Sequence, residues 1–326
     1  MEWRLFFLEK EFKSLDQQLA ILKHRGINVL NDDKVKNYLL TNNYYNIING
    51  YSKPFLLQKE MYLSGTQFNE IKYLYFFDEE MKRLIFHGIL LAEQHIKSVF
   101  AYRFAEAYPD QNYPYLDVDS FDHSKSISIA YIVSKLDRII KKNKRYRNNA
   151  INYYVNKYHN VPIWVLVDFI DFGELQTLIT VLKKPIQNKI AKDLTKFIKD
   201  NIPNFQTVFP PETMLSLIAN IHEVRNICAH NKRLIYFKCR EDSLYFPTLD
   251  EKYSITPNDQ RRDVYTTFIS LQCFLSKTEF AELNNSIRKR IRHILTKQIH
   301  TVDVNSIINL YGFPNDWYKL PPIPQG

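Results

Sequence analysis

QFNEIKYLYFFDEEMKRLIFHGILLAEQHIKSVFAYRFAEA, residues 67–107, is the stretch that decides the fold. Its apolar side chains recur at steps of three and four residues, at Phe68, Ile71, Leu74, Tyr75, Phe77, Met81, Leu84 and Ile85, and again at Leu91, Ile96, Phe100 and Phe104. This period places them on one face of an α-helix. Pro109 and Pro114 end the pattern, because proline cannot continue a helix. The stretch therefore predicts one long amphipathic helix.

Shorter helices are predicted before and after it. The same period and the usual end signals indicate helices over 14–23, 32–42, 126–142, 162–184, 186–200, 212–230, 262–276 and 278–298. Ser14 is expected to cap the first helix, and Asp32 or Asp33 the second. Gly173 interrupts 162–184, so this stretch is either one helix or two helices with a bend.

The composition favours an all-α fold. The chain has 7 glycines in 326 residues, whereas a sandwich or a doubly wound sheet of this length needs many glycine turns. Tyr and Phe, 22 of each, pull weakly toward strand. We predict a small helical N-terminal region over residues 1–62 and a helical bundle over residues 63–300. A proline-containing tail, residues 301–326, is expected to be extended.

Charge and cysteine content restrict the partners and the compartment. The formal charge is 44 − 35 = +9, which favours a polyanionic partner such as RNA, DNA or an anionic membrane surface. The longest apolar run, residues 161–170, is broken by Asp168 and too short to span a bilayer. The three cysteines, Cys228, Cys239 and Cys273, form no CxxC pair, and residues 1–4 do not begin a signal peptide. We therefore expect a cytoplasmic protein that is not inserted in a membrane.

A line of polar residues lies on the predicted helix 212–230. His222, Asn226 and His230 are spaced i, i+4 and i+8, so they share one face. Arg225 stands about 100° around the helix from Asn226, and its long side chain can reach the same surface. Taken alone, His222 is better explained as a packing or hydrogen-bonding residue. Together the four form a compact cluster of imidazole, amide and guanidinium.

This cluster suits the cleavage of RNA. A histidine can remove the proton of a 2′-hydroxyl group, because its ordinary pKa is about 6.5. A planar guanidinium can stabilise the charge that gathers on the phosphoryl oxygens, and an amide can orient the imidazole or hold a phosphate oxygen. We therefore predict Arg225, Asn226 and His230 as catalytic residues and His222 as a supporting one. No carboxylate cluster suggests a metal site, and no cofactor is predicted.

The string Val224-Arg225-Asn226-Ile227-Cys228-Ala229-His230, followed by Arg233-Leu234, resembles the R-N-x-x-x-H signature of HEPN domains. More narrowly, it resembles the Abi family of abortive-infection phage-resistance proteins, in its AbiD/AbiF-like group. Four further segments resemble segments of that family in the same order: Asn43-Tyr44-Tyr45 with Gly50-Tyr51 and Pro54-Phe55; Leu74-Tyr75-Phe76-Phe77-Asp78; Pro162-Ile163-Trp164 with Phe172-Gly173-Glu174-Leu175; and Gly312-Phe313-Pro314 with Asp316-Trp317.

The resemblance implies a HEPN helical bundle behind a small N-terminal extension, and an RNA target. HEPN ribonucleases pair two such domains, so a chain with one R-N-x-x-x-H motif would form its site as a homodimer. Some family members act with a small structured noncoding RNA, which becomes a further expected partner. Glu93, in the long helix, would orient Arg225, although a solvated helix charge is an equal alternative. Some HEPN toxins have a modifiable tyrosine where this chain has Lys232, so that form of regulation is not expected.

Two basic segments are candidates for RNA binding. Lys or Arg contacts to phosphates give affinity without sequence preference, and tyrosine can add stacking. The candidates are Lys141, Lys142, Lys144, Arg145, Tyr146 and Arg147 in the first segment, Lys232 and Arg233 after the motif, and Arg288, Lys289, Arg290 and Arg292 in the second segment. Each segment could also be an ordinary solvated face.

Three functions therefore compete. The first is a metal-independent ribonuclease of abortive-infection defence. The second is a HEPN-type RNA-binding scaffold that acts with a noncoding RNA and does not cut. The third is a regulatory, antitoxin-like partner with an idle motif. The complete set of Arg225, Asn226 and His230 favours the first, because a scaffold has no need of all three.

Overall fold

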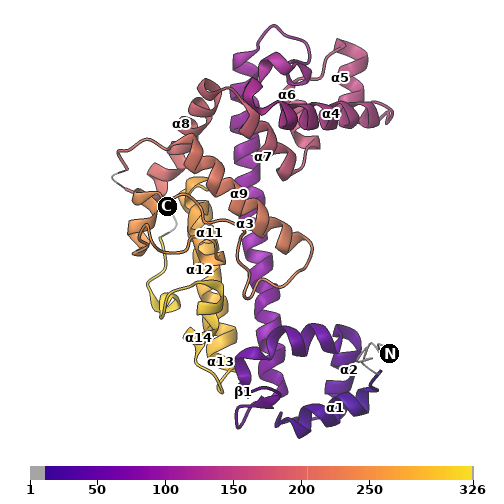
Figure 1. The fold of residues 1–326 in the computed structure, drawn as a ribbon, viewed down its shortest axis with the longest axis vertical. Helices are drawn as coiled ribbons and strands as arrows, with labels where there is room; N and C mark the ends of the chain where they lie inside the picture. The colour runs from indigo at the N-terminus through magenta and orange to yellow at the C-terminus, as the bar shows by residue number, and fades with distance from the viewer. Residues whose placement is uncertain (1–11, 204, 325–326) are drawn as a thin grey trace, which may run out of the picture. The chain divides into compact units, whose positions relative to one another are not determined.

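A computed structural model describes residues 12–203 and 205–324 of the protein (Figure 1). Over these residues the fold is all-α, and the strands found there are β1 (Leu56–Gln58) and β2 (Met61–Tyr62), which pair antiparallel. The predicted fold class is confirmed. Residues 1–4, from which no signal peptide was predicted, lie outside the described residues.

The chain divides into two compact units, each described by itself. Among the described residues, unit 1 contains 12–81, 288–310 and 314–319, and unit 2 contains 82–203, 205–287, 311–313 and 320–324. The long helix α3 (Phe68–Ala107) and the helix α12 (Lys277–Arg290) supply residues to both units. Unit 1 therefore combines residues from the first quarter of the chain with residues near its end.

Unit 1 begins with two short capped helices. Ser14 caps α1 (Leu15–His24), and its hydroxyl accepts a hydrogen bond from the Gln17 backbone N–H at 3.3 Å. The cap of α2 (Asp32–Asn42) is Asn31, not Asp32 or Asp33, because Asn31 has the extended backbone (φ −149°) that a cap requires. The two aspartates lie in the first helical turn instead, where the helix dipole favours negative charge.

Two buried carboxylates tie the remaining parts of unit 1 together. The Tyr51 hydroxyl donates to Asp78 Oδ2 at 2.8 Å, which joins the segment after η1 (Tyr45–Asn49) and next to η2 (Lys53–Phe55) to the start of α3. Glu70 accepts hydrogen bonds from the backbone N–H groups of His300 and Thr301 at 2.7 and 2.8 Å. These bonds fix the residues that follow η9 (Ile291–Leu295) and α13 (Thr296–Gln298) beside α3.

The C-terminal residues differ from the expected extended tail. They form α14 (Val304–Ile308), η10 (Asn309–Tyr311) and η11 (Trp317–Lys319), and the described tail residues outside these elements are 301–303, 312–316 and 320–324. Asp303 caps α14, and the Trp317 ring is buried beneath the Arg288 guanidinium at 4.7 Å. The prolines mark the ends of these short turns, but burial of aromatic side chains decides their conformation.

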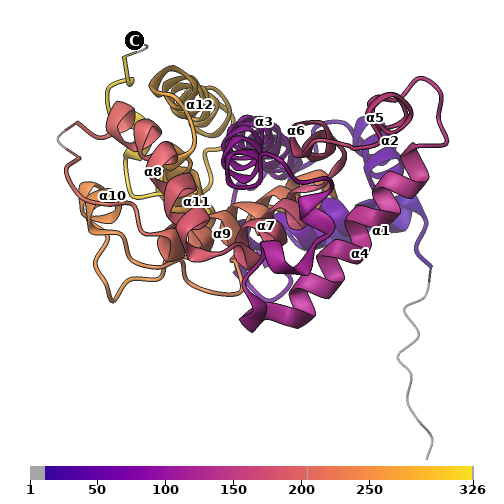
Figure 2. The ribbon, with the colours of Figure 1, turned by 90° about the horizontal axis from the view of Figure 1, so that it is seen from above.

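Unit 2 is a bundle around α9 (Pro211–Ala229), seen from above in Figure 2. This helix packs against α7 (Phe172–Val181), α8 (Lys184–Asn201) and α11 (Val264–Ser270), and α4 (Ser126–Asn143) packs on α7. The other elements of unit 2 are η3 (Pro114–Leu116), η4 (Val118–Ser120), η5 (His123–Lys125), α5 (Ala150–Tyr158), α6 (Ile163–Leu166), η6 (Val167–Phe169), α10 (Pro247–Asp250), η7 (Glu251–Tyr253) and η8 (Leu271–Cys273).

The stretch 162–184 consists of two helical segments, and the break lies at residues 170–171 before Gly173. Asp171 caps α7, and with Glu174 it forms a capping box in which each side chain accepts a hydrogen bond from the other's backbone N–H at 2.8 Å. Gly173 lies inside the first turn of α7. A larger residue would be crowded there, since a Cβ atom at this position would lie only 3.0 Å from Cε1 of His222. The glycine therefore allows the close approach of α9.

Candidate active site

The end of α9 places His230 outside the helix. Lys232 N–H bonds to the Ile227 carbonyl at 3.0 Å and Asn231 N–H to the Cys228 carbonyl at 3.1 Å, which is the Schellman pattern of a helix C-terminus. His230 is the C-cap residue, and Asn231 has the left-handed backbone (φ 50°) that this motif needs. The imidazole of His230 is exposed and, within the described parts of the chain, has no hydrogen-bond partner.

A buried lysine holds this helix end. Lys82, on α3, is 4% exposed, and its ammonium donates to Asn231 Oδ1 at 2.5 Å. The contact joins residues 149 positions apart in the sequence. Because Asn231 directly follows His230, this hydrogen bond restrains the backbone from which the His230 imidazole projects.

Asn226, His222 and Gln176 form a hydrogen-bonded chain. Nδ2 of Asn226 lies 2.9 Å from Nε2 of His222, and Nδ1 of His222 lies 2.9 Å from Oε1 of Gln176. A carbonyl oxygen only accepts, so the consistent arrangement is a neutral His222 that donates from Nδ1 and accepts at Nε2. Burial lowers the pKa of His222, which favours this neutral form. The edge of the Phe172 ring packs against the imidazole at 5.7 Å between centroids.

The guanidinium of Arg225 is held from three sides. Its Nη1 donates to Asn226 Oδ1 at 3.4 Å, its Nε lies 4.0 Å from Glu93 Oε2, and it sits over the Phe86 ring at 5.9 Å. Glu93 is buried and also forms an ion pair with Lys97 at 3.0 Å. A quarter of the Arg225 side chain remains exposed, so the group is restrained yet open to a ligand.

Four polar residues of α9 and its end line one cavity. His222, Arg225, Asn226 and His230 face a space of about 750 Å³, which α7 and the α4 residues Ser128 and Tyr131 complete. All of them belong to unit 2. The imidazole and amide groups on one face of α9, and the guanidinium about 100° around from Asn226, thus line the same cavity.

Two carboxylates of the cavity wall are engaged by the backbone. Asp171 and Glu174 both line the cavity, and both accept hydrogen bonds from backbone N–H groups at the start of α7. The positive end of the helix partly balances their charge. Burial also raises the pKa of Glu174 above its usual range. The two acidic residues therefore repel a phosphate in the cavity less strongly than two free carboxylates would.

The candidate RNA-binding residues lie in different surroundings. Lys141, Lys142, Lys144, Arg145, Tyr146 and Arg147 are exposed at and after the end of α4, and Lys232 and Arg233 are exposed just after His230. Arg288 is buried against Trp317, and Arg290 forms an ion pair with Glu80 at 2.7 Å, both in unit 1. Lys289 and Arg292 are exposed in that unit. We leave Arg288 and Arg290 out of the RNA surface proposed below, because Arg288 is buried and Arg290 pairs with a largely buried carboxylate. Lys141 also pairs, with Asp137 at 2.6 Å, but its side chain stays 63% exposed.

Four site residues escaped the sequence reasoning. Lys82 and Gln176 reach α9 from other helices, and no local pattern relates them to it. Tyr131 lines the cavity with half of its surface exposed, but it looks like any aromatic residue of an amphipathic helix. Gly173 was noted as a helix interruption and as part of a family-like segment; a glycine inside a predicted helix was the available signal.

The described residues lack two features. No group of three or more His, Cys, Asp or Glu side chains is placed there to hold a metal ion. Within the same residues, every helix falls short of the length and apolar character needed to cross a bilayer.

Comparison with known proteins gives one family. The family model described as Abi-like protein matches residues 37–236, which include Glu93, the basic segment after α4 and the whole polar cluster of α9. Searches of curated proteins and of solved structures found no match.

Proposed function

The chain belongs to the Abi-like protein family, and from this premise we propose that it is a HEPN-type endoribonuclease of abortive-infection defence. The family indicates the defence role. The proposal adds the chemistry: RNA is cut by attack of its own 2′-hydroxyl on the adjacent phosphate. Arg225 and His230 act on the substrate, and Asn226 positions Arg225.

One observation carries the proposal: the side chains that this chemistry needs converge on a single cavity. His230 is exposed at the end of α9 without a hydrogen-bond partner among the described residues, so its imidazole is available to a substrate. Arg225 lines the same cavity, with a quarter of its side chain exposed. A packed structural helix has no need to leave an imidazole and a guanidinium open to one cavity.

The reaction follows from these groups. The neutral His230 imidazole removes the 2′-hydroxyl proton, and the resulting oxygen attacks phosphorus. The guanidinium of Arg225 stabilises the negative charge on the non-bridging phosphoryl oxygens. The bond to the 5′-oxygen breaks, and that oxygen takes a proton. The products are a 2′,3′-cyclic phosphate and a 5′-hydroxyl end.

The leaving 5′-oxygen needs a proton donor, and a second copy of the chain would supply one. In a homodimer with two His230 side chains at one site, one imidazole acts as base and the other, protonated, as acid. The exposed segment 141–147 would then hold the RNA backbone. It begins about 15 Å along α4 from the cavity residue Tyr131, at a rise of 1.5 Å per residue.

The decisive experiment is His230→Ala. We expect loss of protection against phage and a fall of about 10²–10⁴-fold in cleavage of single-stranded RNA, with RNA affinity and thermal stability unchanged. His123→Ala is the matched control, because His123 is also exposed and lies outside the cavity. Cleaved ends should be 2′,3′-cyclic phosphates, and cutting should persist in EDTA.

Two results would overturn the proposal. If His230→Ala protects as well as the wild type, the RNA-binding scaffold, acting with a noncoding RNA, becomes the better assignment. If chelation abolishes cutting, the direct attack without a metal is wrong.

A further inference from the structure

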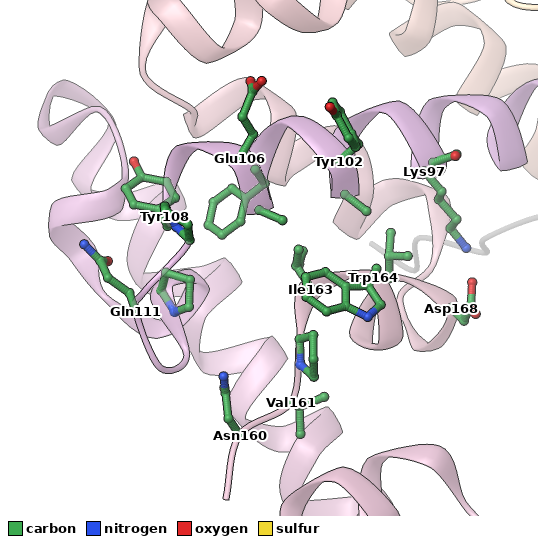
Figure 3. A pocket seen from close by; sticks show the side chains of 18 of the residues that line it. Lys97, Tyr102, Glu106, Tyr108, Gln111, Asn160, Val161, Ile163, Trp164 and Asp168 are labelled. Carbon is green, nitrogen blue, oxygen red and sulfur yellow. The ribbon is translucent and has the colours of Figure 1, made fainter. Parts of the chain in front are cut away.

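A second, larger cavity lies in unit 2 and has no part in the proposed cleavage. It encloses about 1060 Å³ between the second half of α3, the segment 108–114 and α6 (Figure 3). Its floor is apolar and fully packed: Phe104, Val161 and Ile163 are at most 3% exposed. A cavity of this size with an apolar floor is the kind of space that binds a ligand or a side chain of a partner.

A tryptophan stands in this cavity with most of its surface uncovered. Trp164 is 57% exposed, although α6 buries its neighbours Ile163 and Leu166 almost completely. Figure 3 shows its indole next to Ile163 in the space beside α3, with Lys97 and Asp168 at the same end. A large exposed aromatic ring beside an apolar floor is typical of a residue that anchors a binding partner.

The charges of the cavity wall are mainly negative. Glu93, Glu106 and Asp168 line it against a single lysine, Lys97, in a chain whose formal charge is +9. Lys97 already pairs with Glu93 at 3.0 Å and donates to the Ile170 carbonyl at 2.9 Å. The wall therefore disfavours phosphates, which separates it from the RNA surface proposed above.

Two carboxylate groups keep unused acceptor capacity. The carboxylate of Asp168 is exposed and makes no hydrogen bond or ion pair in the described chain. Glu93 is 7% exposed, and its Oε2 has no hydrogen-bond partner among the described residues; Nε of Arg225 lies 4.0 Å from this oxygen. By contrast, Glu106 pairs with Arg103 and Lys189. The open acceptors therefore lie at the Trp164 end.

We propose that this cavity binds a basic side chain, arginine above all, of a protein partner. The guanidinium stacks on the Trp164 indole and pairs with the Asp168 carboxylate, while the aliphatic stem and an adjacent apolar residue cover the floor. A guanidinium fits better than an ammonium, because its plane matches both the ring face and the carboxylate. A nucleobase could stack on the same ring, but its phosphates would meet the acidic wall.

The test uses a defined probe and does not depend on RNA cleavage. The peptide acetyl-Leu-Arg-Leu-Arg-amide is titrated into the full chain, and the indole N–H resonance of Trp164, assigned by its absence in Trp164→Phe, is followed by NMR. A peptide with citrulline in place of arginine has the same shape without the charge. We expect a saturable shift with the arginine peptide and at least about fivefold weaker binding of the citrulline peptide.

Variants localise the binding. Asp168→Asn should weaken the arginine peptide about fivefold and Trp164→Ala about tenfold, as followed by isothermal titration. Glu282→Gln removes an exposed carboxylate of α12 and should change nothing. Equal binding of the citrulline peptide, or an unchanged affinity in Asp168→Asn, would overturn the proposal. A Trp164 shift with single-stranded oligonucleotides but not with the peptide would assign the cavity to RNA instead.

Discussion

At the scale of single residues, the cavity of α9 is organised by the direction of its hydrogen bonds. Arg225 donates to Asn226, Asn226 donates to His222, and His222 donates to Gln176. Each donor faces an acceptor only while His222 is neutral, because a protonated imidazole has no acceptor atom. The protonation state of one half-buried histidine therefore determines whether the amide of Asn226 can hold the guanidinium.

This dependence predicts how stability changes with pH. Burial lowers the pKa of His222 in the folded protein. Below about pH 6.5, the imidazole therefore binds a proton in the unfolded chain but stays neutral in the folded protein. The free energy of unfolding then falls as the pH drops from that value toward the folded-state pKa, and the contribution is fully present above it. In His222→Gln, which cannot titrate, this part of the pH dependence should vanish.

Urea unfolding of the wild type and His222→Gln between pH 5 and 8 measures the difference. His123→Gln serves as control, because that histidine is exposed and outside the cavity. If the wild type and His222→Gln lose stability in parallel on acidification, His222 is not the titrating group, and the neutral relay loses its support.

At the scale of elements, the ending of α9 does as much for the site as the helix itself. The Schellman motif places His230 at the cap and forces Asn231 into the left-handed region, which costs about 1–2 kcal/mol for a residue with a Cβ atom. Asparagine tolerates this conformation, and here its side chain also accepts the Lys82 ammonium. The helix cap and the Lys82–Asn231 hydrogen bond, called the clamp below, together fix the backbone position from which the His230 imidazole projects.

The clamp can be tested by a double-mutant cycle. Asn231→Gly keeps the left-handed backbone but removes the acceptor, and Lys82→Met keeps the aliphatic stem but removes the ammonium. Each should slow RNA cleavage about tenfold by loosening His230, and the double variant should be little worse than either single one, a coupling of about 1 kcal/mol. Additive losses would mean that the Lys82–Asn231 contact does not position the histidine.

The sequence predicted the elements better than their ends and contacts. Helix periodicity located α3, α4, α8 and α9 within one or two residues, because each carries a long apolar stripe. It missed α5, which is short and rich in tyrosine, and it expected an extended tail where buried Trp317 and Tyr311 stabilise short turns. A buried aromatic side chain can outweigh the local preference of nearby prolines.

The candidate site divides in the same way. The spacing of His222, Asn226 and His230 placed them on one face, since that follows from helix geometry alone. The partners Gln176 and Lys82 come from other helices, and only tertiary packing brings them there. The cap of α2 was wrong by one residue, because adjacent Asn and Asp carry equivalent capping signals and the backbone decides between them.

At the scale of the whole molecule, the chain presents two surfaces of opposite character. One surface is positively charged and suits a polyanion: it consists of the cavity beside α9 and the segments 141–147 and 232–233. The other is the larger cavity beside α6, which presents carboxylates and the exposed indole of Trp164. Both cavities belong to unit 2, and Glu93 lies between them: it lines the second cavity and contacts Arg225 of the first. A partner bound at Trp164 would therefore act on the same carboxylate that restrains the guanidinium.

The proposed composite site makes a prediction that only an assembly can satisfy. A chain with Arg225→Ala still carries His230, and a chain with His230→Ala still carries Arg225, so each homodimer alone should be inactive. After the two variants are mixed and allowed to exchange subunits, about half of the dimers combine one chain of each kind, and their shared site again holds a guanidinium and an imidazole. RNA cleavage should return to a measurable fraction of the wild-type rate.

The matched control mixes His230→Ala with the double variant Arg225→Ala/His230→Ala, which cannot restore a histidine. Cleavage that stays absent in the first mixture, although sedimentation shows exchanged dimers, would mean either that the shared site needs both His230 side chains or that each chain needs Arg225 and His230 in its own cavity. Mixing Arg225→Ala with wild type, which keeps both histidines, separates these two outcomes.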